Sequence, residues 1–318
     1  MILVTVSDDR FGRKDGKYSE TQDRITKMFD GKLPVIDWKW HEIQTTRFYR
    51  DNKVLLDNID AARNGRVYKP FVILDALNKV PEGEYIIYND CSPELWENVN
   101  PEKYNLEFIK VLCREANDIL VPFIKWSRTE LKEGQLGEAT HKNYTLTRCM
   151  DKMGLRFYED AYMCASGMIC IRKTEKTLSL VEEWLRWNLI DECCALGWAH
   201  IENDHTFWNE ESHPEFGKEG FKMGCRHDQS ILGLLLARTN HRFCDSDLKD
   251  IHGANFLQFC GNTEYRFIDC LPKLHIGDRV VNKQETQMHV FQIVDGKYAV
   301  GQSDGSQYLT ARENLKLI

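Results

Sequence analysis

The sequence has no run of about 18 apolar residues without a charge, which is roughly the length that a membrane-spanning helix needs. Its first six residues lead directly into the polar segment Ser7-Asp8-Asp9-Arg10. Neither the basic start nor the small-residue cleavage site of a secretory signal is visible there. We therefore expect a protein without a membrane span that is cytoplasmic, or that works in the host cytoplasm if it is viral.

The chain also lacks an excess of positive charge. It contains 42 Lys and Arg against 49 Asp and Glu, which gives a net charge of −7 over 318 residues. Bulk charge of this sign does not attract phosphate backbones, so nucleic acid is not the expected partner. With only 8 Pro and 20 Gly, and with 42% hydrophobic residues, the composition is that of a folded globular protein.

None of the 11 cysteines forms a CxxC pair, and most lie in apolar segments. The adjacent Cys193 and Cys194 are poor candidates for a disulfide. We expect reduced thiols that are buried as small hydrophobic groups, rather than a zinc site or a disulfide framework.

Buried apolar strands and amphipathic helices alternate over most of the chain, which predicts an α/β fold with a mostly parallel sheet flanked by helices. The apolar run at 84–88 is followed by Asn89, Asp90, Cys91 and Ser92. Ligands of open α/β sheets bind at the carboxyl ends of the strands, so this is a candidate binding edge. Strands are predicted at 2–6, 35–38, 84–88, 119–124 and 164–171, and helices at 19–29, 71–77, 106–116, 174–188 and 228–237.

The pattern changes after Pro272. Short strands are predicted at 276–281, 288–294 and 297–300, with turns at Asp295-Gly296 and Asp304-Gly305. The ending at 310–315 resembles the last turn and strand of SH3-like barrels. We expect two domains, at 1–272 and 273–318, the second a small SH3-like β-barrel.

Three blocks of the sequence together resemble a known family. The first is GRVYKP at 65–70, followed by YNDCS at 88–92; the second is CASGMICIRKTEK at 164–176, followed by EWL at 183–185; the third is RHDQSIL at 226–232. Their order is similar to the pattern GxxxWKP, YxDxG/S, GxxxxRKTEK, EWL and HRHDQSI of bacterial and viral polysaccharide-biosynthesis glycosyltransferases. The resemblance implies a GT-A-type fold over 1–272 and an enzyme that moves a sugar from a nucleotide-diphosphate donor, such as a UDP-sugar, to a hydroxyl of a glycan or similar acceptor.

Asp90 is the first candidate site residue, because a carboxylate at the end of a buried strand can hold Mn²⁺ or Mg²⁺ against a diphosphate. Ser92 stands where many relatives have a second acidic residue, and a hydroxyl is a weaker ligand for a hard cation. His275 is a third candidate ligand, since some GT-A enzymes return a late histidine to the cation. The alternatives are that Asp90 only caps a turn and that His275 only begins the β-module.

Asp228 and Gln229 begin a predicted apolar helix. The resemblance implies that they contact the transferred sugar or the reacting centre. A carboxylate near an anomeric carbon can accept a proton from the acceptor hydroxyl or stabilise developing positive charge. The alternative is a simple helix cap, because Asp at a helix start is favoured by the dipole.

Five further residues are candidates for binding the donor. Lys69 and Arg172 could face the diphosphate, although solvated surface cations are the common fate of both residue types. Thr5, Asp8 and Arg10 lie at the end of the first strand and could hold the nucleotide.

Two other functions stay open from the sequence. One is sugar transfer to a modified base of viral DNA, which the acidic net charge disfavours. The other is a non-catalytic protein that binds a nucleotide-sugar or a glycan, which Ser92 in place of an acidic residue would suit.

Overall fold

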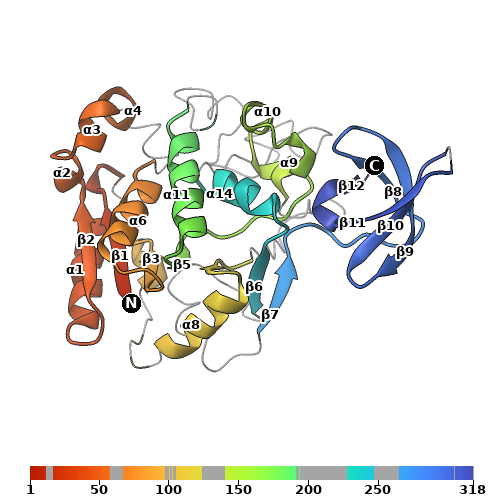
Figure 1. The fold of residues 1–318 in the computed structure, drawn as a ribbon. Helices are drawn as coiled ribbons and strands as arrows, with labels where there is room; N and C mark the ends of the chain where they lie inside the picture. The colour runs from red at the N-terminus through yellow and green to blue at the C-terminus, as the bar shows by residue number, and fades with distance from the viewer. Residues whose placement is uncertain are drawn as a thin grey trace, which may run out of the picture.

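The structure, a computed structural model, consists of an α/β body and a separate antiparallel sheet at the C-terminal end (Figure 1). It describes residues 1–11, 17–57, 67–96, 100, 102, 105–123, 140–190, 193, 228–246, 265–303 and 305–317.

The body is built on a five-stranded sheet with the order β2-β1-β3-β5-β4. Strand β1 pairs in parallel with β2 and β3, whereas β5 pairs antiparallel with both β3 and β4. The sheet is therefore mixed, and the prediction of a mostly parallel sheet is corrected to this extent. An apolar run buried on both faces shows that a strand is central but not in which direction it runs. The strands span Ile2–Ser7 (β1), Val35–Lys39 (β2), Tyr85–Asn89 (β3), Ile119–Leu120 (β4) and Met168–Arg172 (β5).

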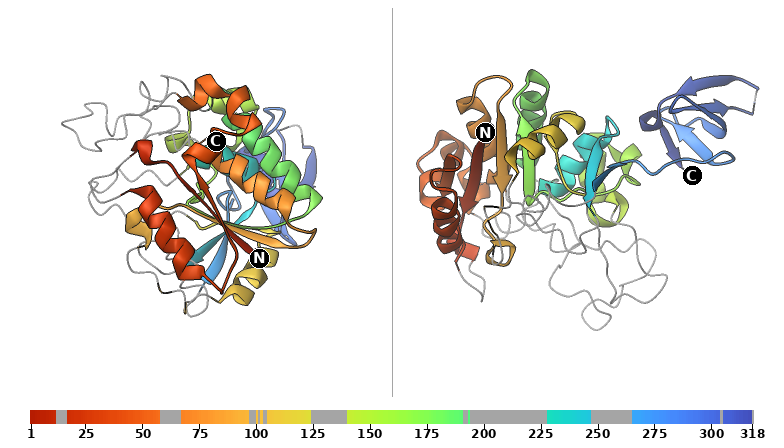
Figure 2. Two further views of the ribbon diagram at one scale, coloured as in Figure 1. Left: turned by 90° about the vertical axis from the view of Figure 1, so that its left-hand side faces the viewer. Right: turned by 90° about the horizontal axis from the view of Figure 1, so that it is seen from below.

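Helices cover both faces of this sheet (Figure 2). One face packs against α6 (Tyr68–Lys79), α11 (Glu175–Asn188) and α14 (Asp228–Ala237). The other face packs against α1 (Tyr18–Phe29) and α8 (Leu106–Glu115). These five helices confirm the helices that the sequence predicts, with α6 beginning three residues earlier than its apolar stripe.

Shorter elements complete the body. The region after β2 forms the helices α2 to α4. The strand predicted at 119–124 is reduced to β4 and two isolated bridges at Pro122 and Phe123. Strands β6 and β7 form a separate antiparallel pair. The shorter elements of the body are Trp40–Ile43 (α2), Arg47–Asp51 (α3), Lys53–Asp57 (α4), Pro93–Trp96 (α7), His141–Tyr144 (α9), Thr147–Met153 (α10), Arg242–Ser246 (β6) and Tyr265–Asp269 (β7).

The C-terminal sheet has the order β11-β10-β9-β8-β12 and a small core of its own around Val280, Val290 and Val300. Asp295 and Gly296 have positive φ angles of 47° and 74° and make the turn between β9 and β10, as predicted. No ladder joins β11 to β12 within the described residues, so the structure shows an antiparallel β-module, and barrel closure stays a prediction. The strands are Arg279–Asn282 (β8), Gln287–Val294 (β9), Lys297–Gly301 (β10), Gln307–Thr310 (β11) and Leu315–Leu317 (β12).

Two further expectations can be compared with the described part of the chain. Its eight cysteines are buried thiols, as expected. None of its helices is long and apolar enough to cross a membrane.

Candidate active site

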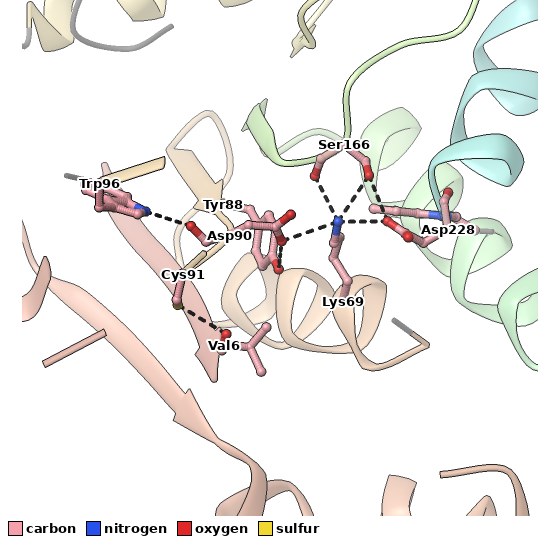
Figure 3. Close-up of polar contacts among 9 residues, drawn as sticks. Val6, Lys69, Tyr88, Asp90, Cys91, Trp96, Ser166 and Asp228 are labelled. Atoms are coloured by element: carbon pink, nitrogen blue, oxygen red, sulfur yellow. Dashed lines mark hydrogen bonds and ion pairs between the residues drawn. The ribbon is translucent and has the colours of Figure 1, made fainter. Parts of the chain in front are cut away.

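Four segments of the chain meet where β3 ends (Figure 3). Strand β3 delivers Asp90, whose backbone N–H donates to the carbonyl of Gly167 at 2.8 Å. Helix α6 contributes Lys69 from its first turn, and helix α14 begins with Asp228. Ser166 lies just before β5 and completes the group.

The ammonium of Lys69 is at the centre of this group. Its Nζ lies 2.8 Å from Oδ2 of Asp228 and 3.4 Å from Oδ1 of Asp90. It also donates to the carbonyl oxygen and to Oγ of Ser166, each at 3.1 Å. The Lys69 side chain is only 1% exposed, so these oxygen atoms replace water as its solvation shell.

Further hydrogen bonds fix the two aspartates. The hydroxyl of Tyr88 donates to Oδ1 of Asp90 at 2.7 Å, and Oγ of Ser166 donates to Oδ2 of Asp228 at 2.8 Å. Two buried indoles hold the main chain, because Trp96 Nε1 donates to the carbonyl of Asp90 and Trp184 Nε1 to the carbonyl of Asp228. Both aspartates are thus held from the backbone and from the side chain.

Among the described residues, the charges of this cluster do not cancel. Two carboxylates share one ammonium, and all three side chains are buried. Burying a carboxylate is costly unless it gains hydrogen bonds and a counter-charge, which the tyrosine, the serine and the lysine supply here. A cluster with one negative charge in excess, next to the end of a strand, suits a cationic ligand or a reaction that develops positive charge.

The three candidate residues at the end of the first strand have different surroundings. Thr5 is fully buried in β1 and its Oγ1 accepts from Nε2 of Gln22 at 3.0 Å, so it contributes to packing under the sheet. Asp8 and Arg10 lie beyond the carboxyl end of β1 and form an ion pair of 2.6 Å. The guanidinium of Arg10 also lies over the ring of Trp40, 3.4 Å from its centroid. Asp8 and Arg10, unlike Thr5, therefore lie at the edge of the sheet where the sequence predicts the nucleotide.

The structure does not bring Arg172 to this group. In the antiparallel pair of β3 and β5, Asn89 lies opposite Met168 and Tyr85 lies opposite Arg172. Arg172 is therefore at the other end of β3 from Asp90, where it pairs with Asp118 at 3.3 Å. If β5 ran parallel to β3, its end would lie at the ligand edge, and its antiparallel direction places Arg172 at the opposite edge instead.

The candidate metal ligands separate in a similar way. Ser92 is buried two residues beyond Asp90, whereas the His275 side chain is 81% exposed in the C-terminal part, 3.7 Å from Asp278. Among the described residues, no group of three or more His, Cys, Asp or Glu side chains could hold a metal ion. A carboxylate and a hydroxyl are hard oxygen donors, and Mg²⁺ sites commonly combine one or two carboxylates with substrate phosphates. Asp90 and Ser92 fit a cation of this kind only as part of a site that the donor completes.

Several residues of the cluster are not among the sequence-predicted site residues. Tyr88 belongs to the YNDCS block, Ser166 to the CASGMICIRKTEK block and Trp184 to the EWL block, but the sequence does not single any of them out as a site residue. Asn89 is a different case. Its side chain is fully buried in β3, and neither its Oδ1 nor its Nδ2 has a hydrogen-bond partner among the residues that the structure describes. Only the tertiary structure reveals such an unsatisfied amide.

Burial shifts the pKa values of two groups beside the cluster, the Cys164 thiol and the His141 ring. Burial raises the pKa of the Cys164 thiol to about 12, so it stays protonated and is a poor nucleophile at neutral pH. Burial lowers the pKa of His141 to about 3, so this ring stays neutral, with Nδ1 2.8 Å from the hydroxyl of Thr145. Gly233 of α14 packs closely on this ring, since a Cβ there would lie 2.7 Å from Nε2 of His141. His141 therefore supports the helix that carries Asp228.

Comparison with protein families, curated proteins and solved structures gives no match. The functional argument therefore depends on the residues of the site and on the sequence blocks quoted above.

Proposed function

We propose that this protein is a nucleotide-sugar-dependent glycosyltransferase, and that the cluster of Asp90, Lys69 and Asp228 is its active site. The observation that carries the proposal is that residues from the three sequence blocks lie within hydrogen-bonding distance of one ammonium. The blocks lie far apart in the sequence, and nothing in their local sequence requires them to meet in space. Their meeting at the carboxyl end of a central strand supports a shared function.

In this proposal, the nucleotide lies along the edge formed by Asp8 and Arg10, and its diphosphate lies beside Asp90. Asp90 and Ser92 would hold a divalent cation, Mn²⁺ or Mg²⁺, together with the phosphates of the donor. When bound, such a cation neutralises negative charge on the departing nucleoside diphosphate.

Asp228 acts at the sugar. Its carboxylate either accepts the proton of the acceptor hydroxyl or stabilises positive charge at the anomeric carbon. Lys69 and Ser166 keep one oxygen of this carboxylate engaged, which fixes its orientation. Gln229, the next residue of α14 and partly exposed, is available to bind the transferred sugar or the acceptor. The glycan or other hydroxyl acceptor would then approach from the side of α14.

A donor screen tests the proposal. The protein is incubated with UDP-, GDP- and CMP-sugars, with and without manganese, and both the melting temperature and the release of free nucleotide are measured. We expect one donor class to raise the melting temperature and to be hydrolysed slowly, and we expect EDTA to abolish the hydrolysis. A thermal shift without turnover of any donor, even with added glycan acceptors, would favour a non-catalytic binding protein instead. Full activity in excess EDTA would remove the cation from the proposal.

A further inference from the structure

The surroundings of Lys69 leave it no direct role at the donor. An ammonium has three N–H donors, and four oxygen atoms already lie within 3.4 Å of Nζ: two from Ser166 and one each from Asp90 and Asp228. The side chain is 1% exposed, so a phosphate could reach Nζ only by displacing one of these partners. Such a displacement would leave a buried charge without its counter-charge, which is costly.

The same contacts place Lys69 between the two halves of the site. Asp90 follows strand β3, and Asp228 begins helix α14 (Figure 3). Among the interactions that the structure gives for the described residues, Lys69 is the side chain that pairs with both carboxylates. Pro70 follows Lys69 in the first turn of α6, where its fixed φ suits a helix start, and the lysine is therefore anchored on a rigid element.

We propose that Lys69 is a positioning residue whose ammonium fixes Asp228 relative to Asp90, and that it does not bind the donor diphosphate. This inference rests on the proposed function and replaces the expectation that Lys69 contacts the phosphates. Without the ammonium the two carboxylates would repel each other, and this repulsion would shift the group at the sugar relative to the group at the leaving diphosphate. Misplacement of a reacting group by about 1 Å can cost roughly a hundredfold in rate.

The experiment compares Lys69→Met with Lys79→Met. Met is close in length to Lys but carries no charge. Lys79 is on the same helix, half-exposed and paired with Asp75, so its variant controls for the loss of a lysine from α6. For Lys69→Met we expect kcat for donor hydrolysis to fall at least 30-fold, while the Kd for UDP, measured calorimetrically, changes less than threefold. Lys79→Met should leave both values unchanged.

A lysine that binds the diphosphate would behave in the opposite way. The Kd for UDP would then rise at least tenfold in Lys69→Met, and that result would overturn the inference. A normal kcat in Lys69→Met would overturn it as well. Both results require an active wild-type protein. If the wild type neither binds UDP nor turns over any donor, the proposed function itself fails, and the two failures are thus distinguished.

Lys69→Met takes a counter-charge away from two buried carboxylates and is expected to destabilise the fold, so a double variant keeps the inference testable. Lys69→Met combined with Asp228→Asn leaves only the charge of Asp90, and its cluster has the same net charge as the wild type. If Lys69 acts by positioning Asp228, the double variant should lose less than threefold in kcat relative to Asp228→Asn alone. A further loss of 30-fold or more, the product expected for independent roles, would contradict the inference.

Discussion

Asp228→Asn separates catalysis from folding at this site. Asparagine keeps the size of the side chain and one oxygen acceptor, and it removes one negative charge. The ammonium of Lys69 remains paired with Asp90 at 3.4 Å, so no buried charge is left alone. Removing one partner of an isolated buried ion pair costs about 3–5 kcal/mol. In Asp228→Asn, the hydrogen bond from Lys69 to a carboxylate is replaced by one to a neutral amide oxygen, which should lower the free energy of unfolding by about 1 kcal/mol. We therefore expect the melting temperature to fall by no more than about 4 °C.

The expected effect on catalysis is much larger. A carboxylate that accepts a proton or stabilises charge in the transition state contributes about 10²- to 10⁴-fold. We expect kcat to fall at least about 100-fold, which corresponds to about 2.7 kcal/mol of activation free energy. Donor affinity should change much less, because the interaction is made mainly in the transition state.

The assay is initial-rate donor hydrolysis and transfer over a range of donor concentrations, with thermal unfolding measured on the same samples. Asp245→Asn is the matched control. The Asp245 side chain is fully buried and pairs with Arg266 at 2.8 Å, outside the candidate site. It should keep its kcat. A normal kcat in Asp228→Asn would reduce Asp228 to a helix cap and would refute the assignment.

Three other predictions follow from the described residues. Asp90→Ala should abolish transfer, and unchanged transfer in a rate assay would exclude Asp90 from the site. The variant should also lower the free energy of unfolding by about 1–3 kcal/mol, because it removes the oxygen that accepts the hydrogen bond of the buried Tyr88 hydroxyl. Burial lowers the pKa of His141 to about 3 and that of His241 to about 4, so the unfolded chain takes up protons first as the pH falls below about 6.5. Denaturant titrations at pH 8 and pH 5 should show a loss of stability at pH 5 of about 2 kcal/mol per histidine; a stability unchanged between these pH values would contradict this reasoning. Truncation near Lys273 removes a module with a core of its own and the ion pair of Lys316 with Glu159, and it should preserve donor hydrolysis while weakening acceptor use or assembly. Loss of hydrolysis together with the manganese response, reproduced by the His275→Ala variant, would return the late histidine to the metal site.

The elements of this protein could largely be read from its sequence. The helix at Glu175–Asn188 shows why, since Thr174 accepts from the N–H of Thr177 at the start and the apolar residues recur on one side. Capping and hydrophobic periodicity act within a few residues, so local sequence carries them. The same holds for β3, whose five buried residues precede Asp90, and for the turn at Asp295-Gly296.

The direction of strands and the partners of buried charges depend on segments far apart in the chain. The apolar residues of β5 would suit either direction, and only its pairing with β3 places Arg172 at the edge opposite Asp90. Local sequence showed Lys69 as a cation after an aromatic residue and before proline, which is compatible with a solvated surface lysine. Helix α6 packs against β3 and α11, and α11 packs against α14, which buries that ammonium instead. Burial requires that oxygen atoms of Asp90, Ser166 and Asp228 surround it. The sequence thus sets which groups can do chemistry, whereas the tertiary structure decides which of them meet, because desolvation of a charge is a property of everything packed around it.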